Sequence, residues 1–198
     1  KIADSVNLDL VKIRFSHRRV PTTSDYIRVI EQNFLEMREL GEFLLNNRLI
    51  KGDAGCLSKR IEEGLLVSAS GCHVGDLKRD DLTLVRKIED KVVYWEGSKQ
   101  PSSETPLLSD IFANHKVARF VVHSHCPIIT YSPSLEDCRS REYVRYGVFG
   151  EYEKVADVLA QNHGFAILRL HGEICVGETA KEIQDKLKER LRKASEHL

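Results

Sequence analysis

The chain has 198 residues, in which 30 basic residues balance 30 acidic ones, and 41% of the residues are hydrophobic. This composition excludes a disordered chain, and the interspersed charges leave no basic patch of the kind that binds nucleic acid or an anionic membrane. We therefore expect one globular domain over residues 1–198, with residues 1–23 as an atypical N-terminal extension.

The cysteines and the apolar segments indicate the compartment. The five cysteines are odd in number and include no Cys-x-x-Cys pair, so a disulfide framework is not expected. Apolar runs such as residues 120–122 are far shorter than the ~20 residues of a membrane-spanning helix. Residues 1–10 lack the apolar core of a signal peptide. These features predict a cytoplasmic protein without a membrane partner.

The first elements of the chain are a strand, a long helix and a hairpin. Residues 6–15 alternate apolar and polar side chains, which predicts a strand with one exposed face. Turn and N-cap residues up to Asp25, followed by an apolar stripe, predict a helix that runs to about residue 47. Strands are expected over residues 58–61 and 65–68, joined by a turn at Glu62-Glu63-Gly64.

The rest of the chain alternates between strands and helices. Strands are predicted over residues 82–88, 91–95, 117–125 and 165–170, and helices over residues 107–115, 151–161 and 178–198. Strands in hairpins with a few flanking helices favour an α/β fold in which helices cover a mixed, mostly antiparallel central sheet.

Three histidines near the predicted strand ends suggest a metal site. His123 and His125 leave the same face of the strand over residues 117–125, about 6–7 Å apart at the backbone, since side chains alternate along a strand. His171 follows a second core strand directly before Gly172, so it can lie at the same sheet edge. Three neutral imidazoles that leave one coordination position open are typical of catalytic zinc.

Glu104 allows two interpretations. It stands at the start of the helix predicted over residues 107–115, where a carboxylate interacts favourably with the helix dipole. Near a metal, the same carboxylate would serve as a general acid and base, or as a fourth ligand. The residue pattern alone leaves both interpretations open.

Several short motifs occur in an order that resembles the class II aldolase/adducin family, which includes L-fuculose-phosphate aldolase. The match covers about residues 27–190, and its motifs are Gly55-x-x-Ser58, Ser68-x-Ser70-Gly71, Gly75-Asp-Leu77 followed by Asp81-Leu82, Pro101-Ser-Ser-Glu104, His123-x-His125 and His171-Gly172 with Gly177. The resemblance implies a three-layer α/β/α fold and a homotetramer with sites at the subunit interfaces. It also implies one Zn²⁺ per subunit, or another divalent metal, on His123, His125 and His171, with Glu104 as the acid/base residue.

The resemblance implies a metal-dependent aldehyde lyase of carbohydrate metabolism. Such an enzyme cleaves a small ketose or ketose phosphate by a retro-aldol reaction through a metal-stabilised enediolate. Two alternatives remain: an epimerase, dehydratase or decarboxylase of the same fold, or a non-catalytic adducin-like interaction module. The module is expected to have lost the metal ligands, which this chain retains.

Two departures from the family pattern concern the substrate. Asp53 and Cys56 stand where the aldolase phosphate loop has Thr and Asn, and a carboxylate repels a phosphate dianion. Ser70, Gly71, Ser102 and Ser103 remain as substrate- or anion-binding donors, so the pattern leaves open whether the substrate is phosphorylated. The segment that carries the family's proton-donating Tyr is shortened, and its candidate replacements, Tyr131, Tyr143 and Tyr146, can equally be packing aromatics.

Overall fold

The computed structural model describes residues 15–196, so the strand predicted over residues 6–15 lies almost wholly outside the described residues. Within the described range, eight strands form one sheet in the order β1-β5-β4-β3-β2-β6-β8-β7. β1 runs parallel to β5, and every other neighbouring pair is antiparallel. The strands are β1 (Ser16–Arg19), β2 (Cys56–Ile61), β3 (Gly64–Ser68), β4 (Leu82–Glu89), β5 (Val92–Glu96), β6 (Phe120–Ser124), β7 (Phe165–Leu168) and β8 (Gly172–Gly177).

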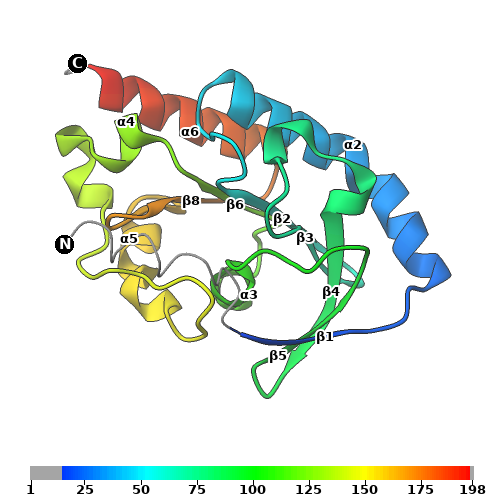
Figure 1. Ribbon diagram of the computed structural model, residues 1–198. Helices are drawn as coiled ribbons and strands as arrows, with labels where there is room; N and C mark the ends of the chain where they lie inside the picture. The colour runs from blue at the N-terminus through cyan, green and yellow to red at the C-terminus, as the bar shows by residue number, and fades with distance from the viewer. Residues whose placement is uncertain (1–14, 197–198) are drawn as a thin grey trace, which may run out of the picture.

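Helices cover both faces of the sheet (Figure 1). The long helices α2 (Ser24–Asn46) and α6 (Ala180–Ser195) lie on one face, and the sheet curves around α3 (Thr105–Asn114) and α5 (Ala156–Gln161) on the other. The remaining helices are short: α4 (Pro127–Thr130) and the 3-10 helices Val74–Asp76, Arg79–Asp81, Pro133–Cys138 and Tyr152–Lys154. The predicted three-layer α/β/α fold with a mostly antiparallel sheet is therefore confirmed.

The alternation of side chains along the strands creates two apolar clusters, one on each face of the sheet. In β6, Val122 belongs to the cluster under α2 and α6, whereas Val121 belongs to the cluster around α3 and α5. Each cluster removes apolar surface from water, which is the main driving force for this layered arrangement. The site described below lies at the end of β6, where the strand leaves the space between these clusters.

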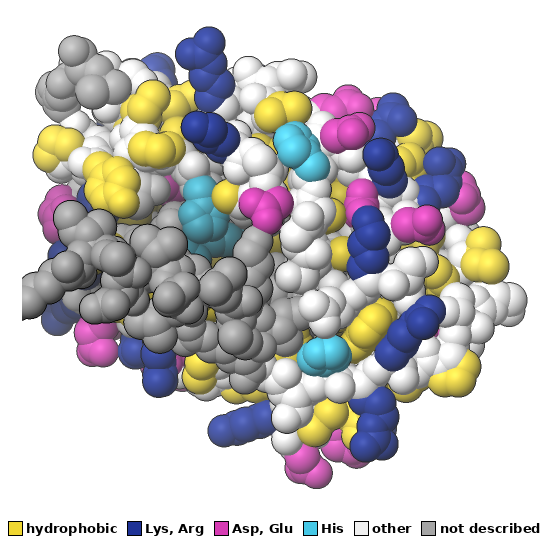
Figure 2. All heavy atoms as spheres, in the orientation of Figure 1, with side chains coloured by type: hydrophobic (Ala, Val, Ile, Leu, Met, Phe, Trp, Pro, Cys, Tyr) yellow, Lys and Arg dark blue, Asp and Glu magenta, His cyan; other side chains and the backbone are white. Residues whose placement is uncertain are grey.

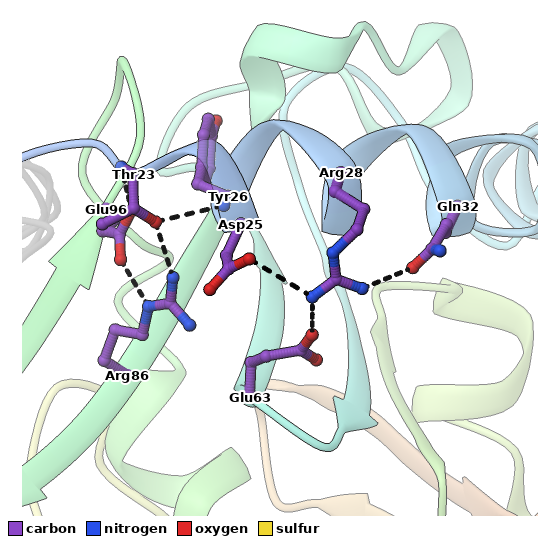
Figure 3. A network of polar contacts seen from close by, with 8 residues as sticks. All are labelled: Thr23, Asp25, Tyr26, Arg28, Gln32, Glu63, Arg86 and Glu96. Carbon is purple, nitrogen blue, oxygen red and sulfur yellow. Dashed lines mark hydrogen bonds and ion pairs between the residues drawn. The ribbon is translucent and has the colours of Figure 1, made fainter.

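The start of α2 is held by side chains of β4 and β5 (Figure 3). The Thr23 side chain accepts a hydrogen bond from the Tyr26 backbone N–H, and the Thr23 N–H donates to the buried Glu96 carboxylate of β5 at 2.8 Å. Arg86 of β4 also donates to Glu96. The predicted helix is confirmed, and Thr23 is its N-cap.

The observed boundaries differ from the predicted ones around β6. The predicted strand over residues 117–125 is shorter, because β6 begins at Phe120 and ends at Ser124. The His125 N–H donates to the Leu49 carbonyl oxygen at 3.1 Å, which takes the chain away from the sheet before Pro127 opens α4. His125 consequently lies just beyond the strand on which the sequence places it.

Three further differences occur in the last third of the chain and at the sheet edge. The helix predicted over residues 151–161 is divided into a 3-10 turn and α5. The strand predicted over residues 165–170 ends at Leu168, because Leu170 adopts a positive φ of 58° in a turn. The sequence analysis also missed β1 and β8, and β8 is a central strand that pairs with both β6 and β7.

The surface agrees with the balanced composition. In Figure 2, basic and acidic side chains are interspersed over the face that is shown. Among residues 15–196, no helix combines the length and the apolar character needed to cross a membrane.

Candidate metal centre and active site

The structure brings the three predicted histidines together. Their ligand atoms all lie within 4.8 Å of one another. The ring centroid of His123 is 4.4 Å from that of His125 and 4.8 Å from that of His171, and the His125 and His171 centroids are 5.2 Å apart. Figure 2 shows histidine side chains gathered at one place on the surface, with an acidic side chain beside them.

Strand pairing explains how distant residues meet. β6 pairs with β8 in antiparallel register, with His123 opposite Ile174 and Ser124 opposite Glu173. The turn between β7 and β8 therefore lies beside the C-terminal end of β6, and His171 occupies that turn. The sequence analysis placed His171 at the same sheet edge as His123 and His125, and in the structure it is the pairing of β6 with β8, a strand that was not predicted, that holds it there.

Hydrogen bonding orients the His123 ring for metal binding. Its Nδ1 lies 2.9 Å from the backbone carbonyl oxygen of Glu173. A carbonyl only accepts, so Nδ1 carries the proton and Nε2 presents its lone pair. Nε2 is buried and has no hydrogen-bond partner. A buried nitrogen in this state fits a metal ligand, since buried polar atoms otherwise find partners.

The imidazoles of His123 and His125 are held in the neutral form that binds metals. Burial, together with the positive charge that His125 and His171 would carry, keeps the pKa of His123 well below its ordinary value. Burial also lowers the pKa of His125, against a hydrogen bond to the His171 backbone. No proton therefore has to leave these two rings before a cation binds near neutral pH.

Gly172 allows the close approach of the two strands. A Cβ atom at this position would lie 2.3 Å from the Ser124 carbonyl oxygen and 3.0 Å from Cε1 of His123. It would also lie 3.2 Å from Nδ1 of His125. The His-Gly pair is thus a packing requirement, because any side chain would push the turn away from the other two histidines.

Glu104 faces the histidines. It is the N-cap residue of α3, but its side chain makes no capping hydrogen bond. Its Oε1 lies 3.7 Å from Nε2 of His171, and its Oε2 is buried without a hydrogen-bond partner. Burial raises the pKa of Glu104 to about 8. The geometry therefore favours the acid/base interpretation over a simple contact with the helix dipole.

A cavity of about 300 Å³ opens above the histidines and Glu104. The four predicted anion-binding residues line it, as does Asp53, whereas the buried Cys56 does not. Two of the expected backbone donors are already used within the protein: Ser70 N–H donates to the Gln100 carbonyl, and Ser102 N–H to the Ser68 carbonyl. A ligand in this cavity would meet Ser70 and Ser102 through their hydroxyl groups.

The three candidate tyrosines differ in position. Tyr146 lines the cavity, and its ring centroid is 5.9 Å from that of His171. The ring centroid of Tyr143 lies 6.5 Å from that of His171, and Tyr143 is exposed. Tyr131 ends α4, is exposed and is not among the cavity-lining residues. Of the three, the structure brings only Tyr146 into the cavity wall.

The sequence analysis missed Glu173. Its backbone carbonyl orients His123, and its side chain is fully buried, so that burial raises its pKa to about 7. The available signal was a single carboxylate within the run Gly-Glu-Ile-Cys-Val-Gly directly after His171. That signal is weak without the knowledge that this run forms a buried strand.

Comparisons with known proteins agree with this geometry. Residues 35–192 match the family described as the class II aldolase and adducin N-terminal domain. The chain is 32% identical over 148 residues to 5-methylthioribulose-1-phosphate/5-deoxyribulose-1-phosphate aldolase from Rhodospirillum rubrum, covering 67% of the chain and 65% of that enzyme. It is 30% identical over 101 residues to methylthioribulose-1-phosphate dehydratase from Methylococcus capsulatus, covering 50% and 48% of the two chains.

The fold resembles that of solved aldolases. L-fuculose-1-phosphate aldolase from Thermus thermophilus superimposes with a TM-score of 0.61 at 19% identity, over 83% of this chain and 91% of that one. The chain thus spans most of that structure, but less than two thirds of the length of the two curated relatives above.

Proposed function

Because the chain belongs to the class II aldolase and adducin family, we propose that it is a metal-dependent aldehyde lyase that cleaves a small ketose or ketose phosphate by a retro-aldol reaction. One observation carries the proposal: three imidazoles with ligand atoms within 4.8 Å of one another stand beside a buried carboxyl group. A non-catalytic adducin-like module has no use for such an arrangement.

A divalent cation would be held by His123, His125 and His171, and Zn²⁺, one per subunit, suits three imidazoles with an open position. When bound, it would supply Lewis-acid stabilisation of the negative charge that develops on the substrate oxygens. The unpartnered Nε2 of His123 and the close packing around Gly172 support this assignment.

Glu104 would move the proton at carbon. In the retro-aldol direction one carbon–carbon bond breaks, the hydroxyl group on the departing carbon loses its proton and becomes the aldehyde, and the carbon left behind gains a proton. A carboxyl group with a pKa of about 8 is suited to deliver that proton and to remove it in the condensation direction. Tyr146, which lines the cavity, would hold the hydroxyl group that becomes the aldehyde.

The polar wall of the cavity would hold the other end of the substrate. Ser70, Gly71, Ser102 and Ser103 offer donors to a phosphate or to sugar hydroxyl groups. The two curated relatives are named for substituted ribulose 1-phosphates, which favours a phosphate. Asp53 opposes a dianion at the same wall, so the substrate class includes unphosphorylated ketoses.

The test begins with metal content. Purified protein is analysed for bound metal as the wild type and as the His123→Ala/His125→Ala double variant, and metal is expected only in the wild type. Equal zinc in both proteins would remove the mechanism. Metal-loaded enzyme is then incubated with phosphorylated and unphosphorylated ketoses, and the aldehyde and the shorter ketose are both measured.

A dehydratase is the second candidate, favoured by the similarity to methylthioribulose-1-phosphate dehydratase. Dehydration keeps the carbon chain intact and releases water, whereas aldol cleavage yields two shorter products. Mass spectrometry of the products separates these reactions, and it also separates epimerase or decarboxylase activity.

We also propose that the protein is a cytoplasmic homotetramer of carbohydrate metabolism, folded as one domain over residues 1–198. Exposed apolar side chains support self-association: Tyr131 is 63% exposed, and Leu170, which precedes His171, is 71% exposed. Light scattering of the purified protein measures the mass directly, and a monomer would contradict the tetramer.

A further inference from the structure

A second buried carboxylate, that of Glu173, lies close to the metal centre but on the other face of the sheet. Glu173 is fully buried in β8, where the following residues Ile174, Cys175 and Val176 are buried and apolar. Its side chain points to the face of the sheet that carries α4 and α6, because the side chain of Cys175, two residues later in the same strand, belongs to the apolar cluster on that face. The side chain of His123, like that of Val121, points to the opposite face. The Glu173 carboxylate is therefore separated from the substrate cavity by the sheet itself.

Within residues 15–196, the hydrogen-bond donors to the Glu173 carboxylate belong to one short segment. Ser124 Oγ donates to its Oε2 at 2.7 Å, the Cys126 backbone N–H donates to the same oxygen at 3.1 Å, and Thr130 Oγ1 donates to Oε1. These donors span the path from the last residue of β6, through His125, to the end of α4. One carboxylate thus fastens both ends of the segment that contains a metal ligand.

The backbone amides of His125 and Cys126 both donate hydrogen bonds that set the path of the chain next to the His125 ring. The His125 N–H donates to the Leu49 carbonyl oxygen at 3.1 Å, and the next amide, that of Cys126, donates to Glu173. The first bond takes the chain away from the sheet, and the second turns it back toward β8. The position of the His125 ring relative to His123 therefore depends in part on the carboxylate, beside the hydrogen bond between the His125 ring and the His171 backbone.

Glu173 also reaches His123 through its main chain. Its carbonyl oxygen orients the His123 ring, as described above, and it stands opposite Ser124 in the β6–β8 register. Glu173 thus contacts the His123 ring through its carbonyl oxygen and residues 124–130 through its carboxylate. An apolar side chain in this place would fill the space but would leave the Cys126 N–H without an acceptor.

We propose that Glu173 is a positioning residue of the metal centre, whose carboxylate sets the path of residues 124–130 and thereby the distance of the His125 ring from His123 and His171. The inference rests on the proposed function, because it requires that the three imidazoles bind a metal. If the carboxylate served only core stability, replacing it would change the melting temperature and leave the metal site unchanged.

The test compares two buried carboxylates. Glu173→Gln keeps the shape and removes one acceptor oxygen. Glu96→Gln does the same to a 2%-exposed carboxylate on β5, which is separated from β6 by β4, β3 and β2. For each full-length protein, Zn²⁺ affinity is measured by competition with a chromogenic chelator. The visible absorption of bound Co²⁺ reports the coordination geometry, and thermal melts without metal report stability.

We expect Glu173→Gln to weaken Zn²⁺ binding by about tenfold or more and to alter the Co²⁺ spectrum, as losses in the shell behind metal ligands do. Glu96→Gln should lower the melting temperature and keep wild-type affinity and spectrum. Thr130→Val should weaken binding in the same direction as Glu173→Gln, and Thr130→Ser, which restores the hydroxyl group, should return it to the wild-type value.

Wild-type affinity and an unchanged Co²⁺ spectrum in folded Glu173→Gln would overturn the inference while leaving the metal centre intact. If that variant does not fold, the Thr130 pair decides: equal affinity in Thr130→Val and Thr130→Ser would overturn it. A wild-type protein that binds neither Zn²⁺ nor Co²⁺ would instead contradict the proposed function, and the inference with it.

Discussion

Oε1 of Glu104 lies 3.7 Å from Nε2 of His171, so the start of α3 meets the turn between β7 and β8. This contact joins two segments that are remote in the sequence. It places a buried carboxyl group at the edge of a histidine cluster, and it separates the two roles of the site. The histidines can hold a cation, and the carboxyl group remains available for proton transfer.

Replacing Glu104 should separate these roles experimentally. Glu104→Gln should reduce kcat by about 10²–10⁴, the usual worth of a general acid/base, while Zn²⁺ affinity remains within a few-fold. Because burial disfavours the ionised carboxylate and Gln cannot ionise, the metal-free variant should melt at the same temperature as the wild type or higher. Wild-type turnover in this variant would exclude Glu104 from the chemistry.

Metal binding should stabilise the protein through His171. At a free Zn²⁺ concentration of about 100 times Kd, linkage gives about 2.7 kcal/mol, which corresponds to a rise in Tm of about 5–10 °C for a domain of this size. His171→Ala should lose most of this rise. His73→Ala, at an exposed histidine outside the cluster, should retain it. An equal rise in both variants would mean that zinc binds elsewhere.

Gly172→Ala should damage fold and site together. The added Cβ would lie 2.3 Å from the Ser124 carbonyl oxygen, a contact that requires the backbone to move. We expect a loss of about 2 kcal/mol in the free energy of unfolding, which is typical of overpacking, together with weaker Zn²⁺ binding. Gly52→Ala is the control, since its Cβ meets no atom within 4 Å and its positive φ accounts for any cost. Urea titration and chelator competition measure the two effects.

Asp53 should influence the choice between phosphorylated and neutral substrates. Asp53→Asn removes one negative charge from the cavity wall, and two charges about 4 Å apart interact by about 1–4 kcal/mol at the dielectric constants of water and of a protein surface. The ratio of kcat/KM for a ketose phosphate to that for the parent ketose should therefore rise at least fivefold. An unchanged ratio would show that the carboxylate does not face the phosphate position.

Glu151 should make stability depend on pH in the acid range. Burial would raise its pKa, but hydrogen bonds from Arg145 and Lys154 outweigh burial and lower the pKa to about 2. The unfolded value is about 4.3, so the stabilisation is complete above that pH and is lost as the pH falls toward 2. Because Arg145 is 57% exposed, we expect about 2 kcal/mol at pH 7. Chemical denaturation between pH 7 and pH 3 should show that the free energy of unfolding falls less in Glu151→Gln than in the wild type.

The sequence by itself determined the features that follow from local periodicity and local chemistry. Helix α2, the hairpin of β2 and β3, and a mostly antiparallel sheet covered by helices were predicted correctly, and the family resemblance added the three-layer arrangement. The order of the motifs was enough to indicate the family. The histidines and Glu104 were also chosen from their types and their places at element ends, because such ends present side chains to a cavity.

Only the tertiary structure decided how these residues meet. The contact between Glu104 and His171 depends on β8, and the sequence analysis missed β8 because its buried Glu173 interrupts an apolar run. Tyr146, and not Tyr131, lines the cavity because of the path of the loop that carries it, and the sequence of that loop has no regular periodicity. Local patterns record which face of a strand or helix is apolar. They do not record which strand lies beside which, since that depends on packing between segments far apart in the chain.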